Sequence, residues 1–278
     1  MNGTQQGEQA KRWNSHAGRA WAEMQGLLDG MFAEVEKVLV ATVSGRRVLD
    51  VGCGTGGTTL AVARAIGGEA ECVGVDISEA VVEFARGRAE REGVRAEFVR
   101  ADAQEYGFEA GRFDMVVSRF GVMFFEDPVR AFANLRGAVR DGGELACVVW
   151  RAAEENPFMT TAERAAAPLL ELPERVPDAP GQFGFADRER VRGILEESGW
   201  SDIDISPVDI PCAIPEPDLL RYLRRMGPVG LALQGLDEQT RDRVIETVRP
   251  AFDPFVRDGE VRYTAACWLV RAASKAAK

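Results

Sequence analysis

One stretch of the chain reads Val48-Leu49-Asp50-Val51-Gly52-Cys53-Gly54-Thr55-Gly56-Gly57. Its apolar first half is typical of a buried parallel strand, and a helical pattern over residues 58–66 follows the glycines. A strand that turns on glycines into a helix presents free backbone N–H groups and the positive end of the helix dipole. We therefore expect this turn to bind a negatively charged or polar small molecule against bare backbone.

On both sides of this turn, short apolar runs alternate with segments of helical period. Strands are predicted over residues 47–51, 71–75, 96–100, 113–118, 144–150, 203–210 and 261–270. Helices are predicted over residues 58–66, 79–92, 128–139, 160–170, 187–198, 217–230 and 236–256, with a turn at residues 141–143. This alternation predicts an α/β fold with a doubly wound, Rossmann-like sheet of seven strands. The helices before the last strand would form a cap over the carboxyl edge of the sheet.

Composition excludes several classes of partner. The 278 residues carry a net charge of −10 with no basic stripe, which argues against nucleic acid and against anionic membrane surfaces. No apolar run reaches the roughly 20 residues that span a bilayer, and the polar N-terminus lacks the core of a signal peptide. The five cysteines are scattered without CxxC or zinc spacing, so we expect no metal and a cytoplasmic protein.

The glycines alone do not identify the ligand. Gly52, Gly54 and Gly57 also satisfy the dinucleotide pattern G-x-G-x-x-G. Asp76, at the end of the second predicted strand, suits a ribose diol in a dinucleotide and in other nucleosides. At this point an NAD-dependent oxidoreductase remains an alternative.

Three further features distinguish the alternatives. Asp50 precedes the glycines, Asp102 ends the third predicted strand, and residues 113–118 are followed by Arg119-Phe120-Gly121-Val122-Met123-Phe124-Phe125. Residues 127–128, 135–137 and 141–143 fit the same pattern. Over residues 11–150 the chain resembles the class I S-adenosylmethionine-dependent methyltransferases of small-molecule type, the UbiE-like or type 11 group.

The resemblance implies roles for residues along the predicted sheet edge. The turn would pass under the methionine part of S-adenosylmethionine, Asp50 would orient the turn or meet the ammonium group, and Asp76 would accept both ribose hydroxyls. Ile77 would pack on the adenine, whose edge Asp102 and Ala103 would bind. The full implied cofactor set is Trp13, Trp21, Asp50, Gly52, Cys53, Gly54, Thr55, Gly56, Asp76, Ile77, Asp102, Ala103, Ser118 and Arg119.

The resemblance also implies an N-terminal lid. Trp13 and Trp21 would close over the sulfonium, whose positive charge favours an aromatic face. Both could instead be packing residues of an amphipathic helix. His16, the single histidine, lies between them and is the candidate catalytic residue, although a lone histidine is usually incidental. The expected division is a lid over residues 1–46, a cofactor-binding core over residues 47–150, and a remainder over residues 151–278 with the cap at about 211–258.

The acceptor pocket is expected to be apolar. Its candidate residues, each of which could instead belong to the core, are Phe120, Met123, Phe124, Phe183, Phe185 and Met226. The expected function is methyl transfer from S-adenosylmethionine to a small, apolar or aromatic molecule. A cofactor-binding protein without transferase activity and an NAD-dependent oxidoreductase are the alternatives. The acceptor atom and the oligomeric state are left open by the sequence.

Overall fold

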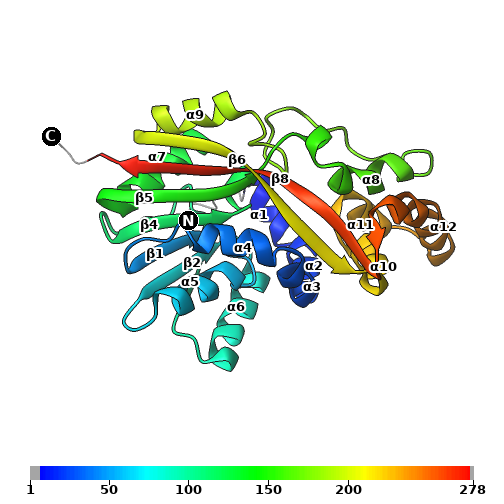
Figure 1. The fold of residues 1–278 in the computed structure, drawn as a ribbon, viewed down its shortest axis with the longest axis horizontal. Helices are drawn as coiled ribbons and strands as arrows, with labels where there is room; N and C mark the ends of the chain where they lie inside the picture. The colour runs from blue at the N-terminus through cyan, green and yellow to red at the C-terminus, as the bar shows by residue number, and fades with distance from the viewer. Residues whose placement is uncertain (1–6, 276–278) are drawn as a thin grey trace, which may run out of the picture.

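A computed structural model describes residues 7–275, and its centre is a sheet in the order β3-β2-β1-β4-β5-β8-β6, with β7 paired to β8 (Figure 1). The first five strands in this order are parallel, and β8 runs antiparallel to both β5 and β6. The strands are β1 Arg47–Val51, β2 Glu71–Asp76, β3 Glu97–Arg100, β4 Phe113–Arg119, β5 Val139–Trp150, β6 Trp200–Pro215, β7 Val256–Arg257 and β8 Glu260–Ser274. The Rossmann-like α/β prediction is confirmed, with the two-residue β7 as an addition to the seven expected strands.

Helices cover the sheet and also gather at one end of the molecule (Figure 1). They are α1 Glu8–Trp13, α2 His16–Glu23, α3 Gln25–Met31, α4 Ala33–Val40, α5 Gly57–Ile66, α6 Glu79–Glu92, α7 Pro128–Ala138, α8 Pro157–Ala166, α9 Arg188–Glu197, α10 Leu219–Arg225, α11 Gly227–Leu233 and α12 Glu238–Val248. The local sequence explains where several of these helices begin. The Asp127 side chain, for example, accepts the Arg130 N–H at 3.0 Å and Pro128 follows at the first position of α7. No helix within residues 7–275 is long and apolar enough to cross a bilayer.

Three predicted elements are corrected by the structure. The expected helix over residues 217–230 is two helices, because the chain turns at Gly227, whose φ is +69°. The expected helix over residues 236–256 is regular only to Val248 and continues as a 3-10 turn, since Pro250 and Pro254 cannot donate helical hydrogen bonds. The expected turn at residues 141–143 lies inside β5, beside a register shift against β4.

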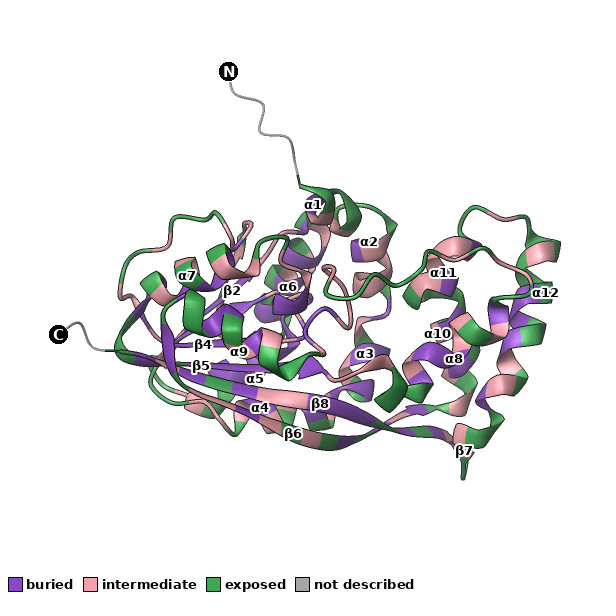
Figure 2. Ribbon diagram, turned by 90° about the horizontal axis from the view of Figure 1, so that it is seen from above, coloured by how far each residue is buried: buried purple, intermediate pink, exposed green. Residues whose placement is uncertain are grey.

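A two-stranded arm extends beyond the parallel sheet. Residues 267–273 of β8 pair with β5, whereas residues 260–266 pair with β6 without contacting β5 in the ladder. The predicted strand over 203–210 therefore lengthens to 16 residues. Prolines at 207, 211 and 215 share one side of β6, so their nitrogens face the free edge, where no ladder bond is lost. The arm carries α10, α11 and α12, and buried residues continue along β8 to this end (Figure 2).

Asn156 fixes the arm where it leaves the sheet. Its Oδ1 accepts the N–H of Ala266 at 2.9 Å, and its Nδ2 donates to the carbonyl oxygen of Ala266 at 3.0 Å. Asn156 also precedes α8, which packs on α11 and α12. We refer to α8, α10, α11 and α12 together as the cap; α8 lies outside the range of 211–258 that the sequence predicts for it.

Candidate functional site

A cavity of about 920 Å³ lies at the carboxyl edge of the parallel strands. One end is lined by the glycine turn, the residues that follow β2 and β3, and the loop after β4. The other end is lined by α8, the segment 174–187, α10 and α11. Ligand pockets commonly enclose about 300–1,000 Å³, so this volume is enough for a cofactor and a second small molecule.

The glycine turn has the shape that the sequence predicts. Gly52, Gly54 and Gly56 have φ of +70°, +52° and +83°, a region that side chains other than glycine rarely adopt. A Cβ on Gly52 would lie 2.6 Å from the Cα of Gly121 in the loop after β4. The turn therefore needs glycine both for its conformation and for this backbone contact.

The hydrogen bonds of the turn differ from the expectation. The N–H groups of Gly52 and Cys53 both donate to the carbonyl oxygen of Val75, at 2.8 and 3.1 Å. The Gly54 N–H donates to Oδ2 of Asp76 at 2.9 Å, and the Gly56 N–H donates within the turn. The expectation of free N–H groups that would cradle an anion is therefore wrong for these four residues. Neighbouring strand β2 satisfies three of them, which the local sequence could not reveal.

Asp50 is fully buried behind the turn rather than in the cavity lining. Its Oδ2 accepts a hydrogen bond from Thr59 Oγ1 at 2.6 Å, while its Oδ1 has no hydrogen-bond partner. Burial raises the pKa of Asp50 to about 6. This contact ties β1 to α5 behind the turn, and orienting the turn stays a prediction for Asp50.

Asp76 and Asp102 both line the cavity beside the turn. Oδ1 of Asp76 accepts the Ser78 N–H at 2.9 Å, and burial raises the pKa of the Asp76 carboxyl. Oδ1 of Asp102 accepts the Gln104 N–H at 2.9 Å. Ile77 and Ala103 line the same end. Parallel strands place these residues together because their carboxyl ends meet at one edge.

Ser118 and Arg119 are adjacent at the end of β4, but only Arg119 lines the cavity. The Ser118 hydroxyl is buried outside the cavity lining, donates to the carbonyl oxygen of Val51 at 2.7 Å and faces the Gly121 N–H at 3.2 Å. Ser118 therefore joins β4 to β1 and does not line the cavity. Arg119 lines the cavity, and its Nη1 lies 3.7 Å from Glu36 without a hydrogen bond.

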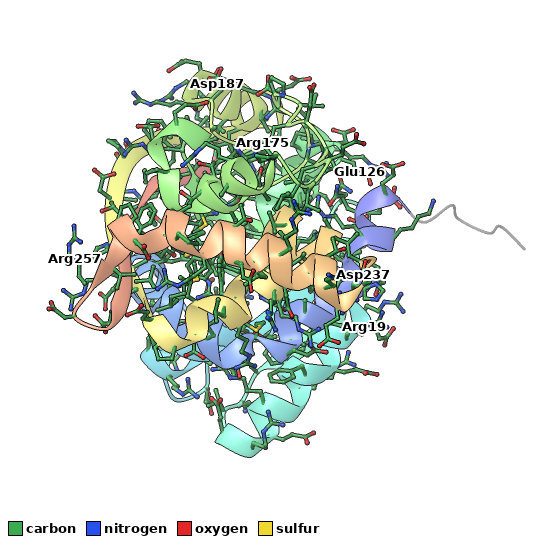
Figure 3. All side chains as sticks on the ribbon, turned by 90° about the vertical axis from the view of Figure 1, so that its right-hand side faces the viewer. Arg19, Glu126, Arg175, Asp187, Asp237 and Arg257 are labelled. Carbon is green, nitrogen blue, oxygen red and sulfur yellow. The ribbon has the colours of Figure 1, made fainter. Side chains whose placement is uncertain are left out.

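The N-terminal helices close one side of the cavity. Trp13 and Trp21 line it with ring centroids 6.1 Å apart, and Phe124 packs edge-on to Trp13 at 5.2 Å. The indole Nε1 of Trp21 lies 3.3 Å from where a Cβ on Gly54 would stand. The start of α1 is held by Glu126, whose Oε1 accepts the Gln9 N–H at 2.9 Å (Figure 3). Residues 1–6 of the expected lid lie outside the described residues.

Several expected site residues lie elsewhere. His16 is exposed on the first turn of α2 and does not line the cavity, a position at odds with the expected catalytic role. Thr55 and Gly56 are buried within the turn and do not line the cavity. Phe185 is buried against Phe132, with ring centroids 5.9 Å apart, and belongs to the core. The remaining acceptor candidates all line the cavity: Phe120, Met123, Phe124, Phe183 and Met226.

The structure adds residues that sequence reasoning missed. Trp150 stacks on Phe120 at 4.6 Å with an interplanar angle of 8°, and both line the cavity. Asn14 donates to the carbonyl oxygen of Ile77 and accepts the Glu79 N–H, in the turn after β2. The missed residues of the cap end are Met159, Glu163, Arg175, Tyr222 and Leu231. They come from separate elements without a common motif, so no spacing in the sequence indicates them.

Comparisons with known proteins agree with this geometry. Residues 48–143 match the family model described as a methyltransferase domain. Over 105 residues the chain is 36% identical to aklanonic acid methyltransferase DauC of Streptomyces sp. strain C5, covering 37% of this chain and 48% of that protein. It is 25% identical over 171 residues to demethylmenaquinone methyltransferase of Staphylococcus saprophyticus, covering 58% and 73% respectively. The chain thus spans about half the length of the first of these relatives.

A solved structure shares the fold over most of its length. The [4+2]-cyclase SpnF is 17% identical, with a TM-score of 0.57 over 94% of this chain and 95% of that chain. A likeness at this identity concerns the fold alone.

Proposed function

Through residues 48–143 this chain belongs to the class I S-adenosylmethionine-dependent methyltransferases, and from that premise we propose that it transfers a methyl group to a small apolar or aromatic molecule. The hydrogen bonding of the glycine turn carries the proposal. Because β2 accepts from the N–H groups of Gly52, Cys53 and Gly54, these three groups are not free to cradle a pyrophosphate. Asp76 and Asp102 add negative charge at this end, which suits a cofactor with a cationic sulfonium and ammonium.

The residues that would hold S-adenosylmethionine fit its parts. The Asp76 carboxyl, which accepts from the backbone N–H groups of Gly54 and Ser78, has further acceptor capacity for ribose hydroxyls, and Asp102 can accept from the adenine amino group. The Nη1 of Arg119, which has no hydrogen-bond partner in the described chain, can donate to the methionine carboxylate. Trp13 and Trp21 offer aromatic faces to the sulfonium.

The bound cofactor supplies an activated methyl group, so the chain mainly aligns an acceptor and excludes water. The lid helices and cap that enclose the cavity support both tasks. The five cysteines are all buried and free, which supports a reducing, cytoplasmic location as part of the proposal.

Calorimetric titration with S-adenosylmethionine, S-adenosylhomocysteine and NAD tests the cofactor. We expect binding of the first two and none of NAD. Asp76→Ala should weaken S-adenosylhomocysteine binding at least about tenfold, since charge-assisted hydrogen bonds are lost. Glu83→Ala, the same charge change on the exposed face of α6, is the control. Unchanged affinity in Asp76→Ala would contradict the ribose assignment, and binding of NAD alone would refute the proposal.

A cofactor-binding protein without methyl transfer is the second candidate. The fold shared with a [4+2]-cyclase supports keeping it, because the fold is compatible with other chemistry. Release of S-adenosylhomocysteine in the presence of an acceptor distinguishes the two.

A further inference from the structure

The cap end of the cavity combines apolar walls with polar groups, and Glu163, Tyr222 and Arg175 form one polar corner of it. Its walls include Met159, Tyr222, Met226, Leu231 and Phe183. These side chains offer thioether and aromatic surface to a flat, apolar ligand. We call this part of the cavity the acceptor chamber.

Glu163 on α8 supplies the first polar group of the corner. Its Oε1 accepts from Arg175 Nη2 at 2.6 Å, and its Oε2 accepts no hydrogen bond from any residue within 7–275. Glu163 lines the cavity, and its side chain is only 17% exposed. Burial raises the pKa of Glu163 against the lowering effect of Arg175. One carboxylate oxygen is therefore available to accept from a ligand.

Tyr222 on α10 supplies the second polar group. Its hydroxyl has one contact within the described chain, the thioether sulfur of Met159 at 3.9 Å. A thioether is a weak acceptor, so the hydroxyl keeps nearly its full hydrogen-bonding capacity. Tyr222 also lines the cavity, and Glu163 is close enough to raise its pKa together with burial, the larger cause.

Arg175 completes the corner from the segment 174–187. Its guanidinium lies 4.9 Å from the centroid of the Phe183 ring and bonds to Glu163, so its charge is already compensated. Figure 3 shows Arg175 at the end of the molecule that carries the cap. The corner thus presents a free carboxylate oxygen and a free hydroxyl, but no unpaired cation.

We propose that the acceptor chamber binds a neutral hydroxylated aromatic compound, whose hydroxyl donates to Glu163 and accepts from Tyr222. A phenolic hydroxyl both donates and accepts, as this pair requires, and the apolar walls cover its ring. An aromatic carboxylate would meet the Glu163 charge at close range. The identification of this compound as the methyl acceptor rests on the proposed function, whereas the binding does not.

Equilibrium dialysis of the full chain tests the proposal, with 2-naphthol, 2-methoxynaphthalene and 2-naphthoate as probes and saturating S-adenosylhomocysteine. The experiment is run near pH 7, where a phenol with a pKa near 10 is neutral. We expect 2-naphthol to bind about tenfold more tightly than either of the other probes, because its hydroxyl alone can donate to Glu163 without adding a charge.

Two variants separate the roles. Glu163→Gln should weaken 2-naphthol about fivefold, leave 2-methoxynaphthalene unchanged and strengthen 2-naphthoate, because the charge is removed. Tyr222→Phe should weaken 2-naphthol and 2-methoxynaphthalene alike, about threefold, because both oxygens accept. Glu171→Gln is the control, because Glu171 is exposed and does not line the cavity. Circular dichroism monitors the folding of each variant.

Equal binding of 2-naphthol and 2-methoxynaphthalene to the unmodified chain would overturn the proposal, as would no binding of either. Preferential binding of 2-naphthoate would show that Arg175 selects an anion instead. Titration with S-adenosylhomocysteine alone tests the proposed function independently. If S-adenosylhomocysteine does not bind while 2-naphthol is still preferred, the cofactor assignment is wrong and the proposal for the acceptor chamber is retained.

Discussion

Asp50 is a carboxyl group held without full solvation at the centre of the molecule. Its pKa in the folded chain is raised from 3.8 to about 6, mainly by burial. A raised folded pKa means that the folded chain binds the proton more tightly than the unfolded chain. The associated stability is fully present below about pH 4 and is lost as the pH rises through about 6.

Asp50→Asn removes this titration and keeps an acceptor for Thr59. The stability of the unmodified chain relative to Asp50→Asn should fall by about 2 kcal/mol between pH 4.5 and pH 7.5. Urea unfolding of both proteins across this range measures the difference. A difference that stays flat with pH would mean that Asp50 ionises in the folded chain as easily as in water.

Gly121 is the partner of the glycine turn across the sheet edge. An Ala Cβ at 121 would lie 2.5 Å from the carbonyl oxygen of Val51 and 2.8 Å from the Cα of Gly52. Gly121→Ala should therefore displace the turn, lower stability by about 2 kcal/mol and weaken S-adenosylhomocysteine binding. Gly137→Ala is the matched control, because nothing lies within 4 Å of its Cβ in α7. There Ala should stabilise the chain by about 0.5–1 kcal/mol. Similar effects of both substitutions on unfolding and calorimetric titration would contradict the contact.

At the scale of elements, the junction of α1 and α2 is bonded to the turn that follows β2. Asn14 Nδ2 donates to the carbonyl oxygen of Ile77 at 3.1 Å, and its Oδ1 accepts the Glu79 N–H at 3.0 Å. Gly18 allows the close approach, since a Cβ there would lie 2.6 Å from Ser78 Oγ. The lid is thus attached to the segment that carries the proposed ribose and adenine contacts.

Asn14→Ala should loosen this attachment and weaken S-adenosylhomocysteine binding about fivefold, because two hydrogen bonds to the turn disappear. Limited proteolysis within residues 8–23 should become faster. Ser15→Ala is the control, since the Ser15 hydroxyl bonds only to Arg12 in the described chain. Unchanged affinity and proteolysis in Asn14→Ala would show that lid and turn are independent.

The helices also show where the local sequence is sufficient to predict the ends of an element. The helix over 79–92 is correct at both ends, and Gly93, with φ of +63°, ends it in the left-handed conformation that favours glycine. The single helix predicted over 217–230 is wrong because apolar period alone does not reveal the break at Gly227. Asp114, near the start of β4, accepts from the N–H groups of Arg46 and Arg47 and from Arg140 Nε. Those partners come from other strands and cannot be identified from its neighbours in sequence.

Across the whole molecule, the two ends of the cavity differ in how far sequence reveals them. Asp76 and Asp102 could be predicted from the family resemblance and from their positions at or just after the carboxyl ends of parallel strands, which meet at one edge. Glu163, Arg175 and Tyr222 could not, because α8, a loop and α10 meet only through tertiary packing. The occupied N–H groups of the turn were missed for the same reason, since their acceptor belongs to another strand.

Amide hydrogen exchange should slow in different residues when a ligand binds to each of these two ends of the cavity. S-adenosylhomocysteine should slow exchange over residues 8–23, 52–56 and 76–79, whereas 2-naphthol should slow exchange over residues 174–184 and 219–233. Mass spectrometry of each complex against the free chain measures this. Protection of the same peptides by both compounds would contradict the division of the cavity into two binding regions.

The far end of the two-stranded arm has a consequence for how α10, α11 and α12 can vary. The N–H of Glu216 donates to the carbonyl oxygen of Gly259 at 2.9 Å, so the chain leaves β6 and re-enters β8 at neighbouring points. The chain between these two residues, which contains α10, α11 and α12, is an insertion whose two ends lie side by side. A segment of another length or sequence can therefore replace it without moving β1, β2 or the glycine turn. The inserted helices can therefore be exchanged as a cassette, which gives evolution or an engineer a way to change what is bound while keeping the cofactor end intact.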